Sequence, residues 1–187
     1  MNETPQGPGA RQHALELVLA PADDTAVRTL WDVLERAGVR SSARHRGPTH
    51  RPHVTVLSGP RPSEVVVELA AELWHDLLPT QLSAAGLVLL GGTRPALAEL
   101  LVADPATVAA RGQVQMLWSG ADARPWVPHL TLAPRLRPEE LTSALAALQD
   151  GAARPPARDG IPVRVASGLR WWDPDEGVVH ELSPQPS

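Results

Sequence analysis

The sequence predicts an α+β domain built from two similar halves, in which helices cover strands that line a central cleft. Two observations support this fold class. Segments with strand periodicity alternate along the chain with segments of helical periodicity, which implies a sheet with helices packed on one face. In addition, a short His-x-Thr-x motif occurs twice, at 53–56 and 129–132, and a helical segment follows each copy. A duplication of this kind would place the two motif strands side by side.

In the first half, alternating leucines predict a strand at 13–20. An apolar stripe at helical spacing then predicts a helix at 21–38, which ends on a glycine. The first motif opens a strand at 53–58. A serine that suits a helix cap opens the next helix, at 63–77, and a proline shortly after it prevents the helix from continuing.

The second half begins with a hairpin, because alternating segments at 81–90 and 96–103 flank a Gly-Gly-Thr-Arg-Pro turn. A proline opens the helix at 105–118, and the second motif opens the strand at 129–133. The same rules give the remaining elements, which are a helix at 138–148, a Pro- and Gly-rich linker at 150–160, and strands at 161–172 and 178–182.

The composition is that of one globular domain. The chain has 187 residues, of which 43% are hydrophobic and 20% charged. We assign this domain to 12–183, with a flexible tail at 1–11 and another at 184–187. The absence of cysteine excludes disulfides and thiolate metal sites and suits a reducing cytoplasm. No apolar stretch approaches the ~20 residues of a membrane span, and the N-terminal segment is not a secretory signal. We expect a cytoplasmic protein that is a monomer and has no obligate protein partner.

The two motifs carry the chemistry. Alternate side chains of a strand share one face, so His53 and Thr55 point one way while the two valines beside them point into the core. His129 and Thr131 obey the same rule. Two such strands facing each other would place two imidazoles and two hydroxyls around one small anion. Imidazole can either remove or supply a proton near neutrality, and a hydroxyl can donate to a phosphate oxygen. Either histidine could be the acid.

With their flanks, the motifs resemble the two-histidine (2H) phosphoesterase superfamily, in its LigT-like group of 2′-5′ RNA ligases and cyclic phosphodiesterases. The resemblance rests on His-Val-Thr-Val at 53–56 and on Trp-Val-Pro-His-Leu-Thr-Leu-Ala-Pro-Arg at 126–135. Two departures concern the substrate: Pro134 precedes Arg135, and no aromatic residue precedes Gly59. The resemblance implies a bilobal, pseudo-twofold α+β fold, with antiparallel sheets lining the cleft that holds both motifs and helices outside.

A basic segment surrounds the first motif. Residues 39–61 contain five arginines and three histidines but no acidic residue, although the whole chain has a formal charge of −4. We predict that this segment faces the substrate, with Arg44, Arg46 and Arg51 as candidate phosphate or backbone contacts. The alternative is a solvated basic loop. Trp126 is a candidate platform for a stacked base, or else a core residue. Arg135 is a further candidate for substrate binding.

These residues and the resemblance predict a phosphodiesterase that hydrolyses 2′,3′-cyclic phosphate ends of RNA or a small cyclic-phosphate nucleotide. We expect no cofactor, and no metal, because the motifs lack acidic or thiolate partners at fixed spacing. Three alternatives stay open: a non-catalytic nucleotide- or RNA-binding module that uses the same cleft, a 2′-5′ RNA ligase, and coincidental motifs in an unrelated α/β domain.

Overall fold

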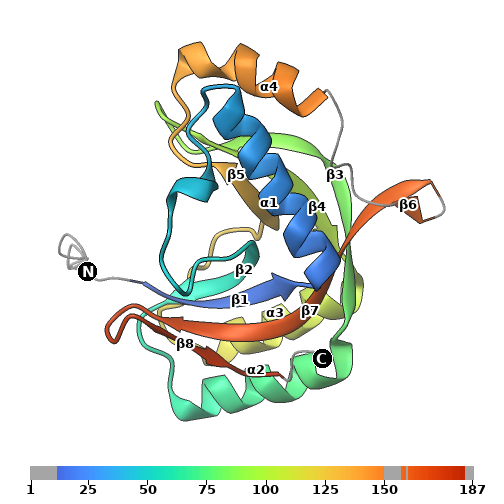
Figure 1. The fold of residues 1–187 in the computed structure, drawn as a ribbon. Helices are drawn as coiled ribbons and strands as arrows, with labels where there is room; N and C mark the ends of the chain where they lie inside the picture. Colours follow the sequence, from blue (N-terminus) through green and yellow to red (C-terminus); the bar gives the residue numbers. More distant parts are fainter. Residues whose placement is uncertain (1–11, 150–156, 159, 184–187) are drawn as a thin grey trace.

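The computed structural model describes residues 12–149, 157–158 and 160–183, and these form eight strands and four α-helices (Figure 1). The strands are β1 (His13–Leu19), β2 (His53–Gly59), β3 (Thr80–Leu90), β4 (Ala96–Ala103), β5 (His129–Ala133), β6 (Ala157–Arg158), β7 (Ile161–Asp173) and β8 (Val178–Glu181). The helices are α1 (Pro21–Arg36), α2 (Glu64–Leu77), α3 (Pro105–Leu117) and α4 (Leu141–Gln149), with short 3-10 turns η1 (Ser42–Arg44) and η2 (Pro138–Glu140).

The order of the strands shows the duplication. Neighbouring strands pair antiparallel in the order β2-β1-β7-β3-β4-β5, while β6 and β8 add to β7. The series β1-α1-β2-α2-β3 has the same order of elements as β4-α3-β5-α4-β7. When each strand is replaced by its counterpart in the other series, the strand order of the sheet is unchanged but reads in the opposite direction. The predicted pseudo-twofold α+β fold is therefore confirmed. The repeat is longer than the sequence indicated, because it includes the strand and helix before each motif.

The two halves are joined by β7. Its first part pairs with β3, where Ala166 faces Thr80, and its later part pairs with β1, where Leu169 faces Leu17. The lobes thus share one continuous sheet whose two end strands are the motif strands β2 and β5. These end strands nevertheless contact each other, so the sheet curls around the space between them (Figure 1).

Each helix pair mixes the two halves. α1 packs against α4, and α2 packs against α3, on opposite sides of the molecule (Figure 1). α1 also contacts β5, while α3 contacts β2, so each motif strand is supported by a helix from the other half. Asp23 fixes the start of α1, because its carboxylate accepts the main-chain N–H of Val165 and faces the buried Arg164 guanidinium, which also binds Glu99.

The predicted elements agree closely with the observed ones. α3 forms although Gly112 weakens its middle, because the carboxylate of Asp104 accepts the Thr107 N–H and caps its first turn. Burial alone would raise the pKa of Asp104, but hydrogen bonds from Thr107 and Thr80 outweigh it and lower the pKa. The sequence did not indicate η1 or β6. The tails at 1–11 and 184–187 and most of the 150–160 linker lie outside the described residues.

The motif strands alternate as predicted. Val54, Val56, Leu130 and Leu132 are at most 1% exposed and belong to the hydrophobic core, whereas the histidines and threonines between them are partly exposed. In each motif strand, this pattern places the histidine and threonine side chains on one face and the aliphatic side chains on the other. In the described part of the chain, no helix is both long and apolar enough to cross a membrane.

Candidate active site

Both motif histidines are oriented by the main chain. Nδ1 of His53 lies 2.8 Å from the carbonyl oxygen of Arg51, and Nδ1 of His129 lies 2.7 Å from that of Val127. A carbonyl oxygen only accepts hydrogen bonds, so Nδ1 carries the proton in each ring. In the neutral imidazole, Nε2 then holds the lone pair. The two halves therefore present the same nitrogen of each ring for proton transfer.

The motif threonines are held through their main chains. The indole Nε1–H of Trp126 donates to the Thr55 oxygen at 2.8 Å, and that of Trp31 donates to the Thr131 oxygen at 3.0 Å. Ser42 Oγ lies 3.4 Å from the same Thr131 oxygen. Among the described residues, neither threonine hydroxyl forms a hydrogen bond, and both side chains are partly exposed. A ligand between the strands could therefore accept from both.

A cavity of about 460 Å³ opens beside the motifs. It brings together Thr55 of the first motif and His129 of the second, and Trp126 lines it beside them. Arg111 of α3 also lines it; this side chain donates to the Val56 oxygen at 3.0 Å and lies over the Trp126 ring at 5.6 Å. Burial lowers the pKa of Arg111, while Asp122 opposes that shift. The cavity thus combines motif residues, an aromatic ring and a cation.

The two histidines differ in their charged neighbours. Glu16 Oε1 lies 3.5 Å from Nε2 of His53, and the other carboxylate oxygen of Glu16 binds the guanidinium of Arg170 at 2.8 Å. Arg170 in turn donates to the main-chain oxygen of Thr49 at 2.9 Å. Within the described ranges, no carboxylate forms an ion pair with His129. The site is therefore symmetric in its backbone geometry but asymmetric in its charge.

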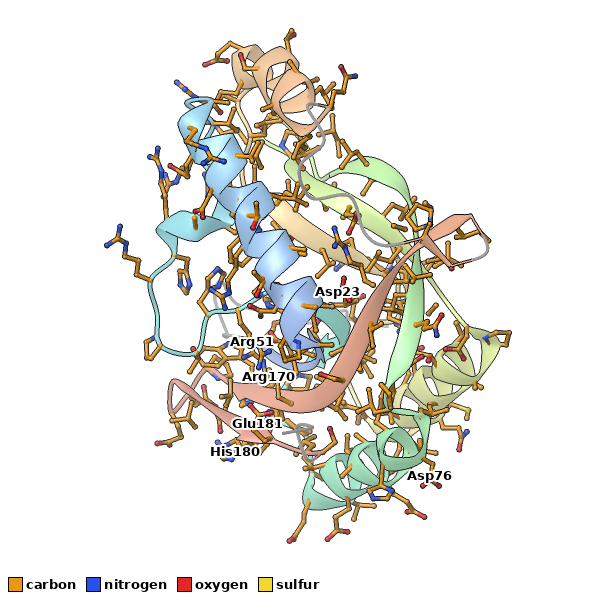
Figure 2. All side chains as sticks on the ribbon, turned by 45° about the vertical axis from the view of Figure 1, so that its right-hand side comes forward. Asp23, Arg51, Asp76, Arg170, His180 and Glu181 are labelled. Carbon is orange, nitrogen blue, oxygen red and sulfur yellow. The ribbon has the colours of Figure 1, made fainter. Side chains whose placement is uncertain are left out.

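The structure places three of the predicted substrate-binding residues outside the motif cavity: Arg51, Arg46 and Arg135. Arg51 is half-buried near the start of α1 (Figure 2). Its Nε faces Asp24 Oδ2 at 3.4 Å, and the guanidinium donates to the Leu19 oxygen at 3.2 Å. Arg46 is exposed on the loop before the first motif. Arg135 lines a second cavity rather than the one that contains His129. Trp126 lines the motif cavity, packs against the hydrophobic core and donates to the Thr55 oxygen, and its stacking on a base stays a prediction.

Behind the second motif lies a histidine that the sequence did not single out. His50 stacks on Trp31 with ring centres 5.2 Å apart, and its Nε2 lies 3.0 Å from the Ser42 oxygen. Burial, with the nearby His45 as the next cause, lowers the pKa of His50 to about 4. Its neutral ring supports Trp31 and Ser42, the two residues that contact the main-chain oxygen of Thr131.

A group of possible metal ligands lies away from the motifs. His13, Asp173 and Asp175 have ligand atoms within 4.8 Å of one another. Arg61 already faces Asp173 Oδ2 at 3.2 Å, and His13 Nε2 lies 3.1 Å from Asp175 Oδ2. The group is at the opposite end of β1 from the residue that pairs with His53. We assign it no part in the candidate site.

Two residues that support the motifs carry no sequence signal strong enough to identify them. Glu16 stands between strand leucines, where a polar residue is usually solvated, yet its side chain is 8% exposed. Trp31 belongs to the apolar stripe of α1, which indicates a core residue and nothing more. A polar group within an apolar element was the one signal that could have pointed to Glu16 and Trp31. A buried carboxylate or indole N–H needs a hydrogen-bond partner, and the partner here is in the site.

Comparisons with known proteins concern the family and the fold of this chain. The family model described as the 2′-5′ RNA ligase superfamily matches residues 21–165, which include both motif strands. A structure of Usb1 from Kluyveromyces marxianus is similar over 91% of this chain and 97% of that chain, with 13% identity and a TM-score of 0.55. A structure of the same protein with uridine monophosphate has 10% identity and a TM-score of 0.51, with the same coverage. At these identities the likeness concerns the fold. No curated protein sequence matches.

Proposed function

Because this chain belongs to the 2′-5′ RNA ligase superfamily, we propose that it is a metal-independent phosphodiesterase that opens 2′,3′-cyclic phosphates at RNA ends or in small nucleotides. The observation that carries the proposal is the matched orientation of His53 and His129. Each ring is fixed through Nδ1 on a main-chain oxygen, which leaves Nε2 for proton transfer on two strands that contact each other.

The proposed reaction needs one base and one acid. The base removes a proton from water while the water oxygen attacks phosphorus. The bond from phosphorus to one ribose oxygen breaks, and the acid protonates that departing oxygen. The product is a phosphomonoester beside a free hydroxyl. Thr55 and Thr131 donate hydrogen bonds to the non-bridging oxygens, which carry more negative charge in the transition state.

The charge asymmetry assigns the two roles. Glu16 places a carboxylate 3.5 Å from Nε2 of His53. On this contact His53 is the proposed acid, which gives its proton to the departing ribose oxygen. His129 forms no such ion pair in the described structure and is the proposed base. In the alternative ligase reaction, a 5′-hydroxyl of a second RNA replaces water as the nucleophile, so the phosphorus–ribose oxygen bond breaks in the same way and the product is a phosphodiester. Product analysis distinguishes the two reactions.

The motif cavity supports a nucleotide as substrate. Trp126 offers an aromatic face for a base, and Arg111 adds a positive charge to the same cavity. The Usb1 structure with uridine monophosphate supports the same ligand class for this fold.

The direct test is incubation with uridine 2′,3′-cyclic phosphate in EDTA, followed by identification of the product. We expect a uridine monophosphate, and no product with the His53→Ala or His129→Ala variant, each of which should stay folded. Binding of the cyclic nucleotide without turnover would favour a non-catalytic module. Activity that EDTA abolishes would contradict metal independence.

A further inference from the structure

Arginine side chains gather around a second cavity, which is separate from the motif cavity. Its volume is about 260 Å³, several times the ~30 Å³ that one water molecule occupies in the liquid, so it is large enough for a phosphate group. Four separate segments contribute to it: the end of α1, η1, the β3–β4 turn and the chain that follows β5. The arginines that line it are Arg40, Arg44, Arg94, Arg135 and Arg137.

The positive charges of this five-arginine cavity are only partly balanced. Arg44 pairs with Glu35 at 2.8 Å, and Arg137 pairs with Glu140 at 2.7 Å. The other three arginines are exposed and form no ion pair with any residue that the structure describes. Because a guanidinium cannot lose its proton in a protein, the cavity keeps a positive charge and favours an anionic ligand.

Main-chain contacts hold the cavity in shape. The N–H of Leu136 donates to the Pro95 oxygen at 2.7 Å, which joins the residue after Arg135 to the residue after Arg94. Arg135 also has φ of 55°, and it is the sole described residue other than glycine with a positive φ. This left-handed conformation is unfavourable for a side chain with a Cβ, so the surrounding structure imposes the direction in which Arg135 leaves β5.

The cavity lies within reach of the motifs. Arg135 follows Thr131 by four residues, which separates their Cα atoms by at most about 14 Å. η1 makes a second connection, because Ser42 contacts the Thr131 oxygen and Arg44 ends the same turn. A single strand of a few nucleotides could cover this distance.

We propose that the five-arginine cavity binds backbone phosphates of single-stranded RNA whose cyclic 3′ end lies between the motif strands. The planar fork of arginine matches the oxygens of a phosphate, and several such forks along a groove are suited to a repeating phosphate chain. This inference rests on the proposed function, and it makes an RNA end, rather than a free cyclic mononucleotide, the preferred substrate.

The test compares two substrates in the full chain. One is uridine 2′,3′-cyclic phosphate, and the other is an eight-nucleotide single-stranded RNA with the same cyclic end. In the Arg40→Gln/Arg94→Gln variant we expect KM for the RNA to rise at least tenfold more than KM for the mononucleotide. Arg36→Gln is the matched control, because Arg36 is also exposed, at the end of α1, but does not line the cavity. Equal rises for both substrates, or the same rise in the control, would overturn the proposal.

Equilibrium binding separates this inference from the proposed function. Fluorescence anisotropy with the labelled RNA needs no turnover, and the logarithm of the binding constant should fall less steeply with log salt in the double variant, by about 0.7 for each phosphate that the variant no longer neutralises. If the variant binds RNA more weakly but the native protein shows no turnover, the five-arginine cavity binds RNA and the proposed enzymatic function is wrong. If the native protein turns over the substrate but the variant binds RNA unchanged, the enzymatic function stands and the RNA-binding role of the cavity is wrong. Displacement of the RNA by inorganic phosphate at equal concentration would assign the cavity to a free anion and overturn the RNA assignment.

Discussion

Trp126 donates its indole N–H to the main-chain oxygen of Thr55 at 2.8 Å. This hydrogen bond connects the segment before the second motif to β2, the strand of the first motif. Trp31 makes the corresponding bond to Thr131. β2 and β5 are the end strands of the sheet, whose outer edges expose unpaired main-chain groups. Two tryptophans satisfy one carbonyl on each edge. The motif strands can therefore approach each other without pairing, which leaves room for a ligand.

Replacing Trp126 by Phe should test this bond. The ring stays, but the Thr55 oxygen loses its donor, and we expect the free energy of unfolding to fall by about 1–3 kcal/mol. kcat should fall as well, because Thr55 is no longer held in place. Trp118→Phe is the matched control, since Trp118 donates in the same way to the Pro60 oxygen outside the motif. Urea unfolding and steady-state kinetics measure both effects, and equal losses of kcat in the two variants would contradict the role of Trp126.

The motif hydroxyls give a second prediction. Thr55→Val and Thr131→Val keep the shape of the side chain but remove a donor to the phosphate oxygens. We expect each to lower kcat by about 10²–10³, with little change in stability. Thr→Ser at the same positions retains the hydroxyl and should retain most of the activity. Steady-state kinetics with the cyclic nucleotide decide the point, and a Ser variant as inactive as the Val variant would show that the methyl group matters more than the hydroxyl.

The assignment of acid and base predicts how the two histidine variants respond to the leaving group. A nitrophenolate leaves without a proton, so a nitrophenyl phosphodiester does not need the acid. His53→Ala should therefore lose far less activity on this ester than on the cyclic nucleotide, whereas His129→Ala should lose activity on both. Initial rates with the two substrates provide the comparison. The opposite pattern would exchange the two roles.

Much of this fold was predictable because it depends on local periodicity. The alternation at 53–56 and 129–132 correctly predicted which side chains enter the core, and apolar residues at helical spacing located the flanking helices. The contact between the two motif strands was predictable from the repeat. The pairing of Glu16 with Arg170 was not, because 154 residues separate them and neither carries a local pattern. The five-arginine cavity was also hidden, since four distant segments form it.

Glu16 and Arg170 form a buried pair, with side chains 8% and 5% exposed. Removing one partner leaves the other charge without compensation, so Glu16→Gln and Arg170→Met should each cost about 3–5 kcal/mol of unfolding free energy. The double variant should cost clearly less than the sum of the two. Chemical unfolding of all four proteins completes the cycle, and additive losses would show that the two residues stabilise the protein independently.

The pH dependence of stability should reveal His50. Its pKa is about 4 in the folded protein, against about 6.5 for an unperturbed histidine, so it stays neutral in the folded state. Between pH 6.5 and pH 4 the unfolded chain binds a proton that folded His50 does not bind. The free energy of unfolding therefore falls as the pH falls through this range, by at most about 1.4 kcal/mol per pH unit, and by less for a ring that solvent partly screens.

His50→Gln removes this contribution. The stability difference between the native protein and the variant should consequently shrink as the pH is lowered from 6.5 to 4, and stay constant above pH 7.5, where neither state of His50 binds a proton. Urea unfolding at intervals of half a pH unit measures it. His75→Gln, at a histidine that is 71% exposed on α2, is the control for replacing a histidine outside the Trp31 contact. A difference for His50→Gln that does not change with pH would mean that the ring beside Trp31 accepts a proton as readily in the folded protein as in the unfolded chain.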